Sequence, residues 1–133
     1  MNPYFSVNQA NEILPTVIKK FDYAKKMKVE VMKMEQQLTS EMTSTTSLEE
    51  YNMVKRKLNS SITKFYQSIE DLENTGVSLK GLDEGLLDFP AKRFDKEIWL
   101  CWKEGETEIK FWHEKDTGFM GRKPISVSNE SLV

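Results

Sequence analysis

The hydrophobic pattern of this chain changes its period once, near residue 76. Before that point apolar residues recur every three or four positions, which keeps one face of an α-helix apolar; after it they alternate with a period of two, as in β-strands. The composition changes at the same place, because the first 75 residues contain no glycine and no tryptophan, whereas the rest holds all six glycines and all three tryptophans. We therefore expect an α+β protein in which a long antiparallel helical hairpin precedes a small antiparallel β-sheet of two or three strands.

The first helix has a readable start. Ser6 and Gln9 have the spacing of a capping box, in which both side chains bond backbone N–H groups that the helix leaves free. Pro15 lies within the apolar stripe that follows and predicts a kink or short break near 11–14, since proline removes a backbone hydrogen bond. The segment 39–47, rich in serine and threonine, then interrupts the helical pattern.

The second helix is predicted by three signals. Ser47 and Glu50 form another capping box, and Gly76 supplies the left-handed position that commonly ends a helix. Between them an apolar stripe repeats at nearly the heptad spacing of a coiled coil. The stripe consists of Tyr51, Val54, Leu58, Ile62, Phe65, Ile69 and Leu72.

The β half begins with a short strand near 77–82 and a loop over 83–90 that contains acidic residues, glycine and proline. Two further strands, 97–103 and 107–113, flank Glu104–Gly105, which predicts a tight hairpin turn. The predicted loops carry most of the residues that could bind a ligand.

Pairing across that turn places Leu100 opposite Ile109, with Ile98 opposite Phe111, and these four residues are expected to join the core. In this register Cys101 and His113 point to opposite faces of the sheet.

The length of 133 residues predicts one domain, composed of a helical hairpin (6–75), a β segment with loops (76–125) and a flexible tail (126–133). The net charge of -2 gives no electrostatic support for general binding to nucleic acid or to an anionic membrane. No membrane-spanning run or signal peptide is visible, and a single cysteine, Cys101, fits a reducing compartment. We therefore expect a soluble cytoplasmic protein.

The length of the predicted helices indicates that the chain associates with another chain. Two helices of roughly thirty residues extend about 45 Å, farther than a small sheet can cover, so part of their apolar stripe needs another cover. A homodimer with a four-helix arrangement is the expected remedy, and a different protein partner is the alternative.

Several short and unusual sequence motifs occur in order along the second half of the chain. Together with 10–15 near the N-terminus, they are similar to the family catalogued as domain of unknown function 2203, and the resemblance extends from Phe5 to about Pro124. It implies no activity, because that family has no agreed biochemical role. Members of the family tend to carry an acidic residue where Gly81 stands here. The motifs are Asp-Glu-Gly-Leu-Leu-Asp-Phe-Pro-Ala (83–91), Leu-Cys-Trp (100–102), Gly-Glu (105–106), Trp-His-Glu (112–114) and Gly-Phe-Met-Gly-Arg (118–122).

A metal site in this chain must rely on carboxylates, because His113 is the only histidine. One imidazole and several carboxylates suit manganese, iron or zinc. The alternative is structural: His113 ends a strand with one ring nitrogen bonded to a backbone carbonyl, and the carboxylates are solvated. The candidate metal ligands are Asp83, Glu84, Asp88, His113, Glu114 and Asp116.

A second group of residues could bind an anion. Gly118 and Gly121 could wrap backbone N–H groups around it while Arg122 forms a bidentate contact. Alternatively the glycines only form turns, and Arg122 pairs with Asp88 or Glu114.

Other combinations are weaker. A nucleophilic Cys101 activated by His113 is opposed by the predicted register. Lys110 opposite Trp99 would form a cation–π pair that explains the tryptophans structurally. Two hypotheses on function remain, either a small ligand-binding protein or enzyme with its site in these loops, or a non-catalytic scaffold that self-associates through its helices. The residues do not distinguish hydrolysis, isomerisation or simple binding.

Overall fold

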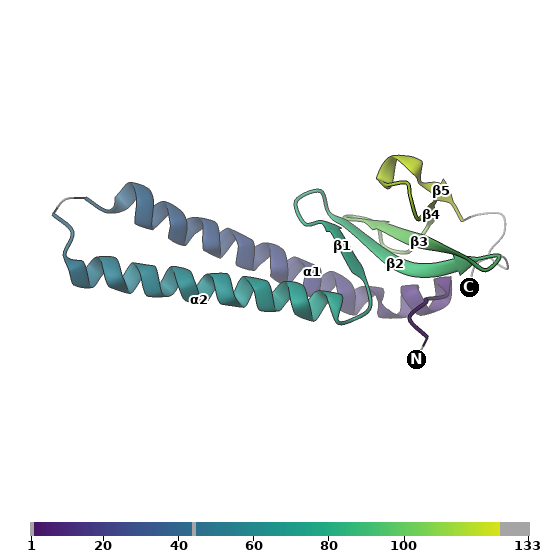
Figure 1. Ribbon diagram of the computed structural model, residues 1–133, viewed down its shortest axis with the longest axis horizontal. Coiled ribbons are helices and arrows are strands. Elements are labelled where there is room, and N and C mark those ends of the chain that lie inside the picture. Colours follow the sequence, from purple (N-terminus) through teal and green to yellow (C-terminus); the bar gives the residue numbers. More distant parts are fainter. Residues whose placement is uncertain (1, 44, 126–133) are drawn as a thin grey trace.

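The computed structural model describes residues 2–43 and 45–125, so the predicted flexible tail, 126–133, lies outside the described residues. Two helices form an antiparallel hairpin, and an antiparallel sheet of five strands in chain order follows (Figure 1). The α+β class is confirmed, although the sheet has more than the expected two or three strands. The helical elements are α1 (Val7–Gln36), the π-helical turn η1 (Gln37–Glu41), α2 (Leu48–Glu73) and the 3-10 turn η2 (Phe119–Gly121). The strands are β1 (Ser78–Gly81), β2 (Leu86–Arg93), β3 (Lys96–Lys103), β4 (Phe111–Glu114) and β5 (Lys123–Pro124).

The helix ends are where the local signals put them. Ser6 Oγ accepts from the Gln9 N–H at 3.1 Å, and Gln9 Oε1 accepts from the Ser6 N–H at 3.0 Å. Ser47 caps α2, and Gly76 has the left-handed φ of +105°. Pro15 does not break α1, because buried residues of the helix on both sides of it pack against the sheet.

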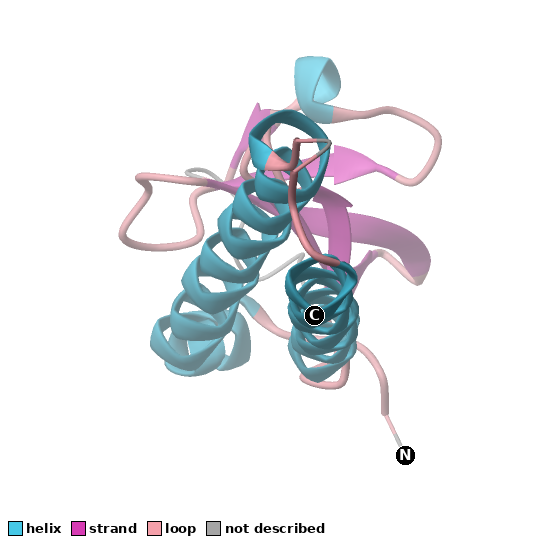
Figure 2. Ribbon diagram, turned by 90° about the vertical axis from the view of Figure 1, so that its left-hand side faces the viewer, coloured by secondary structure: helices cyan, strands magenta, loops and turns pink. Residues whose placement is uncertain are grey.

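One face of the sheet packs on α1 and forms the core. The ring of Phe21 meets Trp102 edge-to-face at 5.3 Å, a favourable arrangement for aromatic pairs. Figure 1 shows the sheet between the helices and η2, and Figure 2, with the hairpin pointing toward the viewer, shows the sheet behind the helices. This inner face carries Leu87, Phe89, Ala91, Ile98, Leu100, Trp102 and Trp112.

The predicted register between the last two long strands is wrong by three residues. Leu100 lies opposite Trp112, and Ile98 lies opposite Glu114. The cause is tertiary: the N–H of Ile109 donates to Asn11 Oδ1 on α1 at 2.7 Å, so Ile109 is in the core but outside the ladder. Because a shift by an odd number exchanges the faces of a strand, β4 turns over relative to the prediction.

The predicted loop 83–90 is mostly strand β2. Leu87, Phe89 and Ala91 point inward with the period of two, but Asp88 and Pro90 between them disguise the pattern. The Pro90 carbonyl accepts from the N–H of Phe5 at 2.7 Å, on the edge of β2 that β1 leaves free. Proline is tolerated there because its nitrogen faces the same edge and no ladder bond is lost.

The hairpin extends beyond the sheet (Figure 1), and its distal half is thinly packed. The last buried residue of α1 is Ala24, and the first buried residue of α2 is Val54. Phe65 and Phe111, both expected in the core, are only partly buried. Within the described part of the chain, no helix combines the length and the apolar character needed to cross a membrane.

Candidate metal site

Three buried side chains of different chemistry meet on the outer face of the sheet. Asp88 of β2 lies directly opposite Cys101 of β3, and His113 of β4 lies opposite Trp99, the neighbour of Cys101 on the same face. Asp88 and His113 are each 2% exposed, and Cys101 is 1% exposed. One carboxylate oxygen, the sulfur and one ring nitrogen of these residues all lie within 4.8 Å of one another.

The ring of His113 is held by two contacts. Its Nδ1 lies 2.8 Å from the Glu114 carbonyl oxygen, and its Nε2 lies 3.0 Å from Asp88 Oδ2. A carbonyl oxygen can only accept, so Nδ1 carries the proton and donates. This is the arrangement that orients metal-binding histidines, because it leaves Nε2 to face the site.

Asp88 is incompletely satisfied. Its Oδ1 is buried and has no hydrogen-bond partner among residues 2–43 and 45–125. Burial raises the pKa of Asp88, an effect that the nearby His113, the charge of Lys80 and a contact from the Cys101 thiol partly oppose. An unpaired buried acceptor costs about 1–3 kcal/mol, which a bound cation at this oxygen would offset.

Cys101 is a protonated thiol in the absence of metal. Burial above all, and then the charge of Asp88, raise its pKa to about 12. The prediction that Cys101 and His113 point to opposite faces is wrong, as the register shows. Even so, both ring nitrogens of His113 already have partners, and the thiol is not activated, so the geometry does not support a cysteine nucleophile.

A pocket of about 230 Å³ opens over these three residues. Its wall includes Trp99 and two lysines from different elements. Lys80 Nζ lies 4.2 Å from the centroid of the Trp99 ring and Lys115 Nζ lies 4.8 Å from it. Lys115 also forms a half-exposed ion pair with Glu97 at 3.5 Å. The base of the pocket is thus lined with potential metal ligands, and two ammonium groups line its side.

Comparison with known families adds one finding. The family described as "Uncharacterized conserved protein (DUF2203)" matches residues 3–125, which is nearly the whole chain. The chain belongs to the DUF2203 family. No curated protein and no solved structure matches it. In this DUF2203 protein, three of the motifs that resemble the family each contribute a residue to the pocket. The segment 83–91 contains Asp88, 100–102 contains Cys101 and 112–114 contains His113.

Of the six candidate ligands named from the sequence, the DUF2203 fold brings Asp88 and His113 together. Asp83 pairs with Lys28 of α1 at 2.6 Å. The exposed Glu84 offers its backbone carbonyl to the Lys103 ammonium.

The other two candidates follow His113 in the chain. Glu114 has the opposite orientation from His113 on β4 and pairs with Lys123 at 2.5 Å. Asp116 is exposed in the turn after β4. Sequence reasoning missed Cys101 as a candidate ligand, and the signal that could have found it is the correct strand register.

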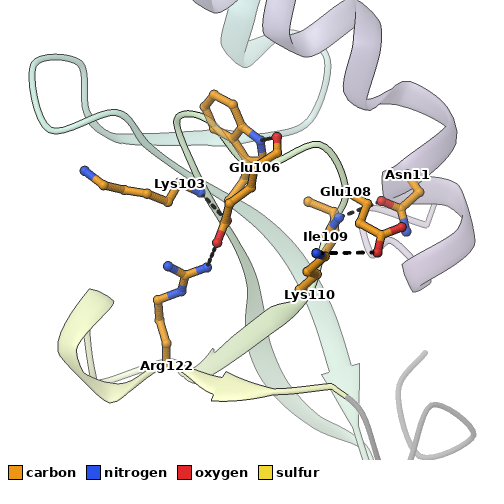
Figure 3. A network of polar contacts seen from close by, with 8 residues as sticks. Asn11, Lys103, Glu106, Glu108, Ile109, Lys110 and Arg122 are labelled. Atoms are coloured by element: carbon orange, nitrogen blue, oxygen red, sulfur yellow. Dashed lines mark hydrogen bonds and ion pairs between the residues drawn. The ribbon is translucent and has the colours of Figure 1, made fainter.

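The residues proposed to bind an anion do not gather at one site. Arg122 Nη2 donates to Glu106 Oε2 at 2.6 Å, and the guanidinium stacks on the Phe111 ring at 3.9 Å. Figure 3 shows Glu106 contacting both this arginine and the backbone N–H of Lys103. The structural alternative, in which Arg122 pairs with Asp88 or Glu114, is therefore wrong, because its partner is Glu106.

The two glycines occupy different surroundings. Gly118 lines the pocket. Gly121 lies in η2, where a Cβ would come within 2.8 Å of the Thr117 side chain. The expected pairing of Lys110 with Trp99 is also absent, because Lys110 pairs with Glu108 (Figure 3) and the ring is contacted by Lys80 and Lys115.

Proposed function

We propose that this protein binds a divalent metal ion through the Asp88 carboxylate, the Cys101 thiolate and Nε2 of His113. The observation that carries the proposal is the buried trio itself, with an unpartnered Asp88 oxygen at the base of a pocket. Among zinc, manganese and iron, a thiolate combined with an imidazole favours zinc. Three protein ligands leave a fourth position open, which is typical of zinc sites that bind water or a substrate.

The three strands hold the proposed ligands in place before a metal ion binds. β2, β3 and β4 are neighbours in one ladder, so the ligands are positioned by rigid backbone rather than by a loop. Bonds to zinc are about 2.0–2.3 Å long, and ligand atoms that lie within 4.8 Å of one another are near enough to surround a single ion. Binding displaces the thiol proton of Cys101. Because this thiol must stay reduced, we place the protein in a reducing compartment such as the cytoplasm.

The test is elemental analysis of untagged protein purified without chelators, followed by zinc titration of the metal-free form. We expect one zinc per chain in the wild type and loss of zinc in Cys101→Ser and His113→Ala. Asp116→Asn, which removes an exposed carboxylate outside the trio, is the matched control and should keep its zinc.

Circular dichroism of each variant separates loss of metal from loss of fold. Cobalt replacement gives a second readout, because only a thiolate ligand produces a sulfur-to-cobalt charge-transfer band, which Cys101→Ser should abolish. A wild-type protein that neither contains nor binds a divalent metal would overturn the proposal, as would a folded Cys101→Ser variant with unchanged affinity for zinc.

A second function is favoured by a different observation, the exposed apolar side chains of the distal hairpin. Met32 is 58% exposed and Leu48 is 73% exposed. We propose that this half of the hairpin pairs with a second copy of the chain, which is compatible with a metal site at the far end of the molecule. Light scattering should give a dimer mass at micromolar concentration and a lower mass for Met32→Lys. A monomeric wild type contradicts self-association.

A further inference from the structure

The charges around the pocket point to the ligand of the open metal position. Five titratable side chains line this pocket in the described part of the chain: Lys80, Asp88, Cys101, His113 and Lys115. With a divalent ion bound, the carboxylate of Asp88 and the thiolate of Cys101 together offset the charge of the metal. The two lysines then leave the pocket positive. In the part of the chain that the structure describes, Lys115 forms an ion pair with the half-exposed Glu97, whereas Lys80 forms no ion pair.

The two ammonium groups lie near one aromatic ring and belong to one pocket. Lys80 and Lys115 each contact the ring of Trp99, which stands opposite His113 on the outer face of the sheet. Because both side chains also line the pocket, an anion bound there is attracted by both charges. Lys80 lines the same pocket as Asp88, and its charge acts on that carboxylate.

The size of the pocket limits what can bind. Its volume of about 230 Å³ is below the roughly 300–1,000 Å³ typical of pockets for drug-sized ligands. Leu86 and Phe119 add apolar surface to the wall. Such a pocket suits a compact anionic head with little attached to it. Arg122 does not line the pocket and donates to Glu106, so Lys80 and Lys115 are the cations of the pocket wall.

We propose that the open metal position takes a small oxyanion, a carboxylate or a phosphate, held jointly by the metal, Lys80 and Lys115. This inference rests on the metal site proposed above. Lysine contributes a compact positive charge to such a ligand, while the metal accepts one of its oxygens.

The experiment is calorimetric titration of zinc-loaded protein with inorganic phosphate and, in a separate arm, with acetate. We expect one anion per metal, and the arm with the tighter binding identifies the head group. Lys80→Gln and Lys115→Gln should each weaken binding by about tenfold while zinc content stays at one per chain. Lys110→Gln, an exposed lysine away from the pocket, is the matched control.

Failure of the inference differs from failure of the metal site. Full zinc content with no binding of either anion, or with anion affinity unchanged in both pocket lysine variants, overturns the oxyanion ligand and leaves the metal site standing. Absence of zinc from the wild type overturns both. In the cobalt-loaded protein, an anion that enters the metal coordination shell must change the visible absorption spectrum, and an unchanged spectrum on saturation also contradicts the proposal.

Discussion

The two faces of the sheet are built from the same strands but are buried in different ways. On the inner face, Leu87, Leu100 and Trp102 are fully buried under α1, and removal of apolar surface from water accounts for that burial. On the outer face, Asp88, Cys101 and His113 are buried to nearly the same degree. Burying a carboxylate, a thiol and an imidazole costs free energy unless each is paired. The inner face therefore stabilises the fold, whereas the outer face draws on that stability to hold a site.

The largest effect is expected on the inner face. Phe89→Ala should lower the free energy of unfolding by about 3–5 kcal/mol, because the ring is fully buried and the truncation leaves a cavity. Phe111→Ala, on the outer face and only partly buried, should cost clearly less. Urea unfolding of both variants measures the difference. Equal losses would contradict the distinction between the faces.

Metal removal is the corresponding test on the outer face. At a free zinc concentration about a hundredfold above Kd, the metal should add about 2.7 kcal/mol to the free energy of unfolding. Thermal unfolding with and without a chelator measures this gain. Cys101→Ser should show the same stability in both conditions, and a zinc-dependent shift of equal size in that variant would exclude the thiolate as a ligand.

The stability of the metal-free form and the affinity for zinc should change with pH in opposite directions. Because the pKa of Asp88 is raised in the folded protein, its contribution to the stability of the metal-free form is present at low pH and is lost as pH rises through that pKa. Zinc affinity should instead rise with pH, since Asp88 and Cys101 must lose protons to bind. Asp88→Asn should remove its part of the metal-free slope in urea unfolding at several pH values. An unchanged slope would show that Asp88 titrates alike in the folded and unfolded chains.

The smallest effect on stability is expected at Gly118. Its φ is -115° and a Cβ there would meet no atom within 4 Å, so Gly118→Leu should change the free energy of unfolding by less than about 0.5 kcal/mol. The added side chain should still narrow the pocket and weaken anion binding, with zinc retained. Calorimetry measures both affinities. Anion affinity equal to that of the wild type would place this loop outside the ligand site.

The helices could be predicted because their signals are local. Each signal concerns backbone only a few residues away: the two helix starts are capped by Ser6 and Ser47, and the left-handed position after the second helix is taken by Gly76. The register of β4 could not be, since it depends on the bond from Ile109 to Asn11, 98 residues apart in sequence. Two of the three residues of the proposed trio, Asp88 and His113, were therefore named as candidate metal ligands from the sequence, and Cys101 was not.

Strand β2 illustrates a different obstacle. Leu87, Phe89 and Ala91 alternate correctly, but Asp88 and Pro90 are residues that normally argue against a strand. Both exceptions have a tertiary cause, because Asp88 pairs with His113 and Pro90 faces an edge next to Phe5. The residue that obscured the strand in the sequence is thus also a member of the site.

The division of the tryptophans between the faces gives the molecule its own optical reference. Trp102 and Trp112 are buried on the inner face, while Trp99 alone stands on the outer face beside the pocket. Emission from the two inner indoles reports the integrity of the core, whereas emission from the outer indole responds to the ammonium groups near it and to anything that displaces them. Replacing the inner pair by phenylalanine would leave a single tryptophan, whose emission reports on the pocket.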